Sequence, residues 1–423
     1  MSSRPSHTPP LVAALLSALV LAAAPAPAET QRVPKYIVNP EQPFATACRA
    51  LHFPVSPVSK IVAYANRPSP STLDRLVRGR QAVRGALGST MTLDALVDAL
   101  EGKRLEVPFP SQINRLAAVV SNPARRALGL AFAINYAAYG EEQRREVAPI
   151  PHAAHPDAVA LVVETLTRGA GHTPDERASR VVLALLHDLI EDAVHRDARS
   201  LQAHPEVLQI VEPGVVPVGL SLSERLVRST AAARSALNDV FMGLPIPGAG
   251  GVGDAVVYLT EPPSPQGFAG YADVPRGFPG SKHLRRRMTR SAFFGELILS
   301  GGDCVADVKG CDAGVNADRT HALEEPDSRG LPRKQRVLND LATRSFLGAE
   351  FATVPGTTGA ITSAVDDTIT AVMNSPAIVE VAGPDRWCEF CRLRQWTARF
   401  AENNRPRIKE HIKRYLDELA GYP

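Results

Sequence analysis

Apolar residues recur every three or four positions over much of the chain, and this spacing predicts helices. It is clear from Ser71 to about Leu100, and it returns in residues 111–119, 124–139, 157–168, 222–242, 333–351 and 386–419. As far as Ala193, no alternation of apolar and polar residues extends far enough to predict a strand. The pattern therefore predicts an all-α protein.

The most apolar of these segments ends in a cluster of ionisable side chains. Residues 181–186 are all apolar, and they are followed by His187, Asp188, Glu191 and Asp192. An apolar run without a polar face predicts a helix buried on all sides, here spanning Asp175 to Ala193. On that helix the four ionisable side chains share an arc of roughly 140°. Burial of such groups is costly unless they pair with one another or bind a metal ion.

Length and charge narrow the possible functions. The chain has 423 residues, enough for two or three domains, and a formal net charge of +3. So small a charge gives no electrostatic case for nucleic-acid binding.

The N-terminal residues are typical of an export signal. An apolar run covers residues 11–24, and small residues before Glu29 offer a cleavage site. The run is shorter than the roughly 20 residues that span a bilayer, although a retained N-terminal anchor is the alternative. We expect a signal peptide over residues 1–28, no stable membrane insertion after its cleavage, and a periplasmic or extracellular location.

The five cysteines are interpreted in the light of export to an oxidising compartment, where disulfides persist. Cys304 and Cys311 lie close in sequence and are candidates to pair. Cys388 and Cys391 could close a local disulfide or supply half of a zinc site, but no second cysteine or histidine pair completes such a site. An odd count leaves one thiol over, most simply Cys48.

A Gly/Pro-rich segment covers residues 243–280 and contains the glycine cluster 248–253. Glycine clusters cradle phosphate where a strand meets a helix N-terminus, but no such context is evident here, and a flexible loop is the simpler interpretation. The basic cluster Lys282–Arg290 follows. It is either a solvated helix start or an anion-binding patch.

Metal binding requires ligands from several elements, and two further segments offer them. His155 precedes one predicted helix, and Asp312 and Asn316 lie four residues apart late in the chain. Two imidazoles and two carboxylates with open coordination positions suit Mn²⁺ or Fe²⁺ better than structural zinc. Such an ion activates water and polarises a phosphoryl oxygen, and Glu191 and Asp192 would orient or deprotonate that water.

The order of these motifs resembles the HD-type hydrolase domain of RelA/SpoT homologues. The matching elements are the His155-Pro pair, the run from Leu185 through His187-Asp188 to Glu191-Asp192, and the segment Val308-Lys309 with Asp312 and Asn316. Members of that family remove the 3′-pyrophosphate of (p)ppGpp with Mn²⁺. The resemblance covers about residues 125–350.

The resemblance implies a role for each matching residue. His155, His187, Asp188 and Asp312 would hold Mn²⁺, and Glu191 and Asp192 would be the catalytic acids. Substrate contacts would come from Asn316, Lys309 and the basic residues Arg144 and Arg145, with Arg285–Arg287 as further candidates. The partner would be a small nucleotide.

The resemblance also implies a domain organisation. The signal peptide and an N-terminal arm with helices (29–120) would precede an HD-type helical bundle (121–350) that carries an insertion at about 205–300. A C-terminal helical extension (351–423) would follow. Unlike the family, the last motif lacks Arg and His between Asp312 and Asn316, and no alarmone synthetase motifs follow. These departures favour an alternative, a secreted binding protein on a degenerate HD scaffold without catalysis.

Overall fold

The fold is all-α, as predicted. The computed structural model describes residues 68–139, 144–145, 148–196, 222–262, 282–322 and 332–422, and most of them are helical. The predicted signal peptide and residues 29–67, which include Cys48, lie outside the described residues. Within them, no helix is long and apolar enough to cross a membrane.

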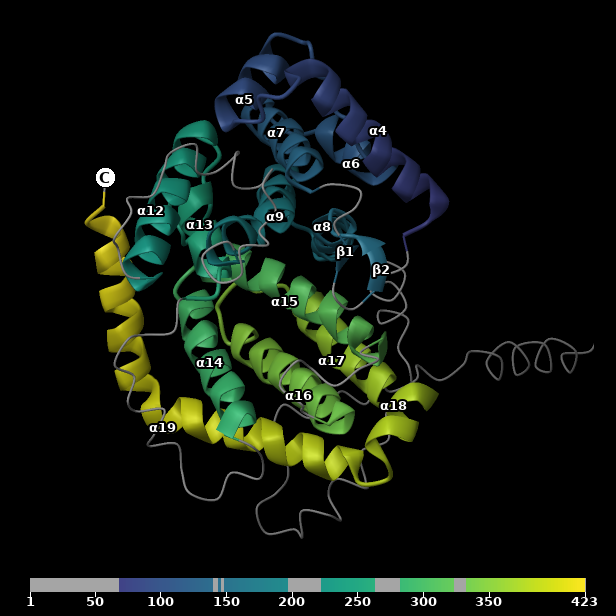
Figure 1. Cartoon of the computed structure of the whole chain (residues 1–423), viewed down its shortest axis with the longest axis vertical. Coiled ribbons are helices and arrows are strands. Elements are labelled where there is room, and N and C mark those ends of the chain that lie inside the picture. Colours follow the sequence, from purple (N-terminus) through teal and green to yellow (C-terminus); the bar gives the residue numbers. More distant parts are fainter. Residues whose placement is uncertain are drawn as a thin grey trace, which may run out of the picture.

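The N-terminal helices form one end of the molecule (Figure 1). They are α4 (Pro70–Leu87), α5 (Leu93–Glu101), α6 (Ser111–Ala117) and α7 (Asn122–Ala138). Ser69, Thr92 and Ser121 cap three of them, because each side chain accepts a hydrogen bond from the first helical turn. A short antiparallel hairpin follows, made by β1 (Arg144–Arg145) and β2 (Ala148–Pro151).

Two central helices, α8 (Ala154–Gly169) and α9 (Pro174–Leu186), pack against each other, and α9 also packs against α7. Thr173 and Glu176 form a capping box that fixes the start of α9. Residues 181–186 are all buried, as predicted. The predicted continuation of the α-helix to Ala193 is wrong, because α9 ends at Leu186 and a π-helical segment, η1, covers Glu191–Arg196.

The segment predicted as an insertion contributes α12 (Leu222–Val240), α13 (Val252–Leu259) and α14 (Lys282–Leu299). Its glycine cluster forms a tight turn closed by an Ile246–Gly250 bridge. Contrary to the sequence interpretation, this turn leads directly into a helix, α13. Two amides in its first turn are already satisfied, because the Oδ1 atom of Asn238 accepts hydrogen bonds from the amides of Gly253 and Asp254.

The same turn touches the start of α15 (Gly302–Asp318), at a point where only glycines fit. Gly248 and Gly302 both have a φ of 84°, a region that favours glycine. A Cβ atom on Gly248 would lie 2.9 Å from the Cα atom of Gly302. The start of α15 therefore rests on the backbone of the Gly/Pro-rich segment.

The remaining helices are η3 (Arg319–Ala322, a 3₁₀ turn), α16 (Arg333–Phe351), α17 (Gly359–Met373), α18 (Pro376–Ala382) and α19 (Arg386–Ala420). In Figure 1, α19 wraps around one side of the molecule, and it packs against α14, α16 and α12. Pro406 lies inside α19 and cannot donate a backbone hydrogen bond there, which favours a bend.

One hydrophobic core extends from Leu76 on α4 to Leu419 on α19 and includes the apolar end of α9. A second cluster joins α16, α17, α18 and the start of α19. Buried ion pairs cross the larger core. Arg75 pairs with Asp157 at 2.7 Å, and Arg180 pairs with Asp307 at 2.8 Å.

The cysteines do not form the predicted pairs. Cys304, Cys311, Cys388 and Cys391 are all thiols outside any disulfide. Cys304 and Cys311 lie on the same helix, α15, two turns apart. Seven residues of α-helix rise about 10.5 Å, which exceeds the span of a disulfide. Cys388 and Cys391 lie on α19, where Cys391 is buried.

Candidate metal centre

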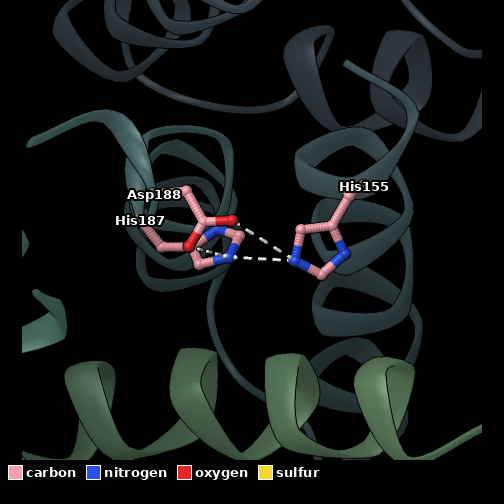
Figure 2. A group of neighbouring side chains, drawn as sticks. All are labelled: His155, His187 and Asp188. Carbon is pink, nitrogen blue, oxygen red and sulfur yellow. Dashed lines mark hydrogen bonds and ion pairs between the residues drawn. The ribbon is translucent and has the colours of Figure 1, made fainter. Parts of the chain in front are cut away.

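Three helices bring their ionisable side chains to one point in the interior. His155 lies in the first turn of α8, His187 and Asp188 follow the last residue of α9, and Asp312 lies in the second half of α15. Figure 2 shows His155 facing His187 and Asp188 across the gap between their two segments. The sequence-predicted ligand residues therefore converge, although the last comes from a distant part of the chain.

The distances between possible ligand atoms are short and similar. The Nε2 atom of His155 lies 3.3 Å from Nε2 of His187, 3.5 Å from Oδ2 of Asp188 and 3.1 Å from Oδ1 of Asp312. The Nε2 atom of His187 lies 3.2 Å from Oδ1 of Asp188 and 3.5 Å from Oδ1 of Asp312.

These spacings fit a metal ion. Ligand atoms about 2.1 Å from a shared ion are separated by about 3.0–3.4 Å at octahedral or tetrahedral angles. The donor set contains two imidazole nitrogens and two carboxylates, a combination that suits a divalent transition metal. The residues present therefore fit a bound ion of this class.

The orientation of His187 also suits a metal ligand. Its Nδ1 atom lies 2.7 Å from the carbonyl oxygen of Ala184, which can only accept a hydrogen bond. In neutral His187 the proton is therefore on Nδ1, and Nε2 presents its lone pair to the cluster. Hydrogen bonds of this kind fix the ring of metal-binding histidines.

Without a metal ion, the charges of the cluster are strongly coupled. Burial disfavours protonation of His187, but Asp188 and Asp312 outweigh it and raise its pKa to about 10. Burial raises the pKa of Asp188, but His187 and His155 hold it well below its usual range. Burial opposes ionisation of Asp312 too, yet Lys309 and His187 hold its pKa low. Asp188 and Asp312 therefore favour the charged state, which is the form in which a carboxylate binds a metal ion.

Two residues predicted to bind substrate contact Asp312 instead. The Nζ atom of Lys309 lies 2.7 Å from Oδ2 of Asp312, and Asn316 donates to Oδ1 at 2.5 Å. Lys309 is buried and also lies over the ring of Phe294. Both side chains thus belong to the cluster, and both orient Asp312.

The two predicted catalytic acids occupy different surroundings. Asp192 is buried, accepts a hydrogen bond from the hydroxyl of Tyr139 at 2.9 Å, and lies 2.9 Å from Nε2 of His152. The ring of Tyr139 stacks on that of His152 with centroids 4.5 Å apart. Asp192 is therefore held in place from two sides.

Glu191 is not held in this way, and no hydrogen bond joins it to the described residues. Burial is the largest influence on it, and Glu261 and Asp188 add to this, so the pKa of Glu191 rises to about 7. Glu261 lies in the Gly/Pro-rich segment, two residues after the end of α13, and pairs with Arg290 on α14. A carboxyl group with a pKa near neutrality can exchange protons readily in a reaction.

A cation that the sequence did not suggest also lies near the cluster. Arg344 on α16 donates from Nε and Nη2 to Asp340, at 2.9 and 3.1 Å. Asp340 also accepts a hydrogen bond from Thr320, one helical turn beyond Asn316. Burial opposes the charge of Arg344, but Asp340, with Asp312 and Asp188 further away, raises its pKa. Arg344 therefore belongs to the electrostatic surroundings of the site.

The remaining basic candidates for substrate contacts come from β1 and from α14. Arg144 and Arg145 form β1, and Arg144 pairs with Pro151, one residue before His152, so its backbone lies close to the site. Their side chains, and those of Arg285–Arg287, lie outside the described residues.

Tyr139, Glu261 and Arg344 were missed because nothing in their local sequence distinguishes them. His152 carried a weak signal, since it lies three residues before His155.

Comparisons with known proteins identify no relative, since no family model matches the chain, and no curated protein or solved structure matches it significantly.

Proposed function

We propose that this protein is a metal-dependent phosphohydrolase that removes pyrophosphate or phosphate from a nucleotide, with a (p)ppGpp-like 3′-pyrophosphate as the leading substrate. The observation that carries the proposal is the convergence of His155, His187, Asp188 and Asp312 at ligand-to-ligand distances of 3.1–3.5 Å. The resemblance of these motifs to HD-type hydrolases supports the reaction class and Mn²⁺ as the ion.

A divalent ion in this cluster would polarise a phosphoryl oxygen and acidify a water molecule. Glu191 would accept the proton of the attacking water, because it is near the cluster and not committed to a hydrogen bond there. Asp192 would orient that water, since Tyr139 and His152 fix its carboxylate. Lys309 holds Asp312 in position.

The phosphate groups of the substrate require cations at the edge of the cluster. Arg344 is anchored by Asp340, and its Nη1 atom makes no hydrogen bond to the described residues. Guanidinium groups bind phosphate oxygens through charge-assisted hydrogen bonds. Arg344 would therefore bind phosphate together with Arg144 or Arg145, and Asn316 would contact the nucleotide. The apolar N-terminal run supports export, so the substrate would lie outside the cytoplasm.

The direct test is hydrolysis by the purified full chain. The protein is incubated with Mn²⁺ and a panel of ppGpp and other nucleotides, and the products are separated by anion-exchange chromatography. Asp312→Asn should abolish turnover, whereas Asp74→Asn, in an exposed ion pair on α4, should not affect it. Absence of turnover with every nucleotide, or equal turnover in both variants, would sink the proposal.

A second function is favoured by one observation. Lys309 and Asn316 occupy both oxygens of Asp312, an arrangement that satisfies the carboxylate without a metal ion. A secreted binding protein on a degenerate HD scaffold would show this arrangement. Metal analysis separates the two functions, because a bound ion stabilises the folded state by about 2.7 kcal/mol at 100 times its Kd. A binding protein without a metal site would melt at the same temperature with and without a chelator.

A further inference from the structure

A second group of ligand atoms lies directly beside the first. It consists of His152, Asp188 and Asp192, whose donor atoms all lie within 4.8 Å of one another. Asp188 belongs to both groups, because it also lies within 4.8 Å of the ligand atoms of His155 and His187. The structure therefore presents two three-residue groups that share one carboxylate.

The local fold brings the second group together. His152 lies just before α8, and its carbonyl oxygen accepts a hydrogen bond from the amide of His155 at 2.9 Å, so both histidines face the site from one helix start. The amide of Asp192 donates to the carbonyl oxygen of Asp188 at 2.8 Å where the chain enters η1. The two carboxylates therefore lie one helical turn apart.

The members of the second group are buried and oriented. His152 is 3% exposed and Asp192 is 0% exposed. Tyr139 donates to Oδ2 of Asp192 and stacks on the ring of His152, so one side chain positions two possible ligands. Outer contacts of this kind are typical of metal ligands, whose orientation they fix.

The charge of the site favours more than one cation. Four carboxylates gather here, those of Asp188, Glu191, Asp192 and Asp312. The ion pairs described for them include one permanent cation, Lys309. When all four carboxylates are ionised, a single divalent ion together with Lys309 leaves one negative charge, and buried charge without compensation is costly. A second ion would give the site a positive excess, which an anionic phosphate substrate would neutralise.

We propose that His152, Asp188 and Asp192 bind a second divalent metal ion, so that the site holds a pair of ions bridged by Asp188. The proposal deepens the phosphohydrolase function proposed above and rests on it for its chemistry. Paired ions about 3.5–4 Å apart act in phosphate-ester hydrolysis by stabilising both the attacking and the leaving oxygen. In this arrangement Asp192 is a ligand, and Glu191 alone remains to accept the proton.

The test counts ions, independently of activity. The purified full chain is stripped with a chelator and titrated with Mn²⁺, with isothermal calorimetry for stoichiometry and electron paramagnetic resonance for spin coupling between neighbouring ions. We expect two Mn²⁺ per chain with a coupled spectrum. His152→Ala should bind one Mn²⁺ with an uncoupled spectrum. The matched control His172→Ala, three residues beyond the end of α8, should bind two. Tyr139→Phe should weaken the binding of the second Mn²⁺ by about tenfold.

The wild-type count decides the proposal even if His152→Ala does not fold. One Mn²⁺ per wild-type chain, or a count that His152→Ala leaves unchanged, would overturn it and would show that His152, Asp192 and Tyr139 form a hydrogen-bonded triad without an ion. Hydrolysis with one bound ion would overturn the second site and leave the proposed function intact. Two coupled ions without hydrolysis of any nucleotide would support the second metal site and overturn the proposed function.

Discussion

Arg180 on α9 donates from Nε to Asp307 on α15 at 2.8 Å, although the two residues lie 127 positions apart. Nη2 of Arg180 also donates to Asp303 at 2.7 Å. Asp307 accepts further hydrogen bonds from the amide and the hydroxyl of Thr358. This buried cluster joins the two helices that carry His187 and Asp312, so it sets the distance between two proposed metal ligands.

Replacement of Arg180 by Met should destabilise the protein by about 3–5 kcal/mol, because it leaves Asp307 charged and unpaired in the core. Urea unfolding measures the loss. The matched control is Arg78→Met on α4, whose ion pair with Asp74 is exposed and whose loss should change stability by about 0.5 kcal/mol or less. Equal effects of the two substitutions would contradict a structural role for the Arg180 cluster.

Site residues that their neighbours in the sequence distinguish could be predicted, whereas those positioned by contacts distant in the sequence could not. His187 and Asp188 could be found because an apolar helix ends in them, and His155 because it precedes a helix with a similar pattern. The position of Asp312 beside the other proposed ligands could not be predicted from its neighbouring residues, since it depends on how α15 packs against α8 and α9. The π-helical segment after α9 was missed because its residues show no departure from an ordinary helical pattern.

Arg344→Gln should weaken nucleotide binding without unfolding the protein, since among the described residues Arg344 is anchored only to Asp340 on its own helix. A hydrogen bond to a charged group contributes about 1.5–3 kcal/mol, so KM should rise about 10- to 100-fold, with a smaller change in kcat. Steady-state kinetics on the best nucleotide of the panel measure both constants. Arg414→Gln, on the exposed side of α19, is the control. An unchanged KM would remove Arg344 from the substrate site.

Because the pKa of Glu191 is raised, the difference in stability between the wild-type protein and Glu191→Gln should depend on pH. Between its ordinary value of 4.5 and about 7, the folded protein keeps a proton on Glu191 that the unfolded chain has released. Stability of the chelator-treated protein should therefore fall as pH rises through this window, and Glu191→Gln should not share that part of the fall. Urea unfolding of both proteins at several pH values tests this. A stability difference that is constant with pH would show that Glu191 has no raised pKa.

The cysteines give a prediction about thiol reactivity. Burial raises the pKa of Cys304 to about 12 and that of Cys311 well above its ordinary value. Since the thiolate is the reactive form, both should resist alkylation in the folded protein. In urea without a reductant, both should be alkylated, because they are free thiols. Peptide mass spectrometry identifies the modified residues, and a requirement for reductant would show that Cys304 and Cys311 are oxidised.

The contact between Gly248 and Gly302 has a consequence for how this protein can change over evolutionary time. Each glycine leaves space for the backbone of the other, so neither position can accept a side chain unless the chain moves apart there. The turn that precedes α13 therefore supports the start of α15, the helix that carries Asp312. A shortened chain without the Gly/Pro-rich segment would not be a minimal form of the same protein, because α15, which carries the last proposed metal ligand, would lose the backbone contact that supports its start.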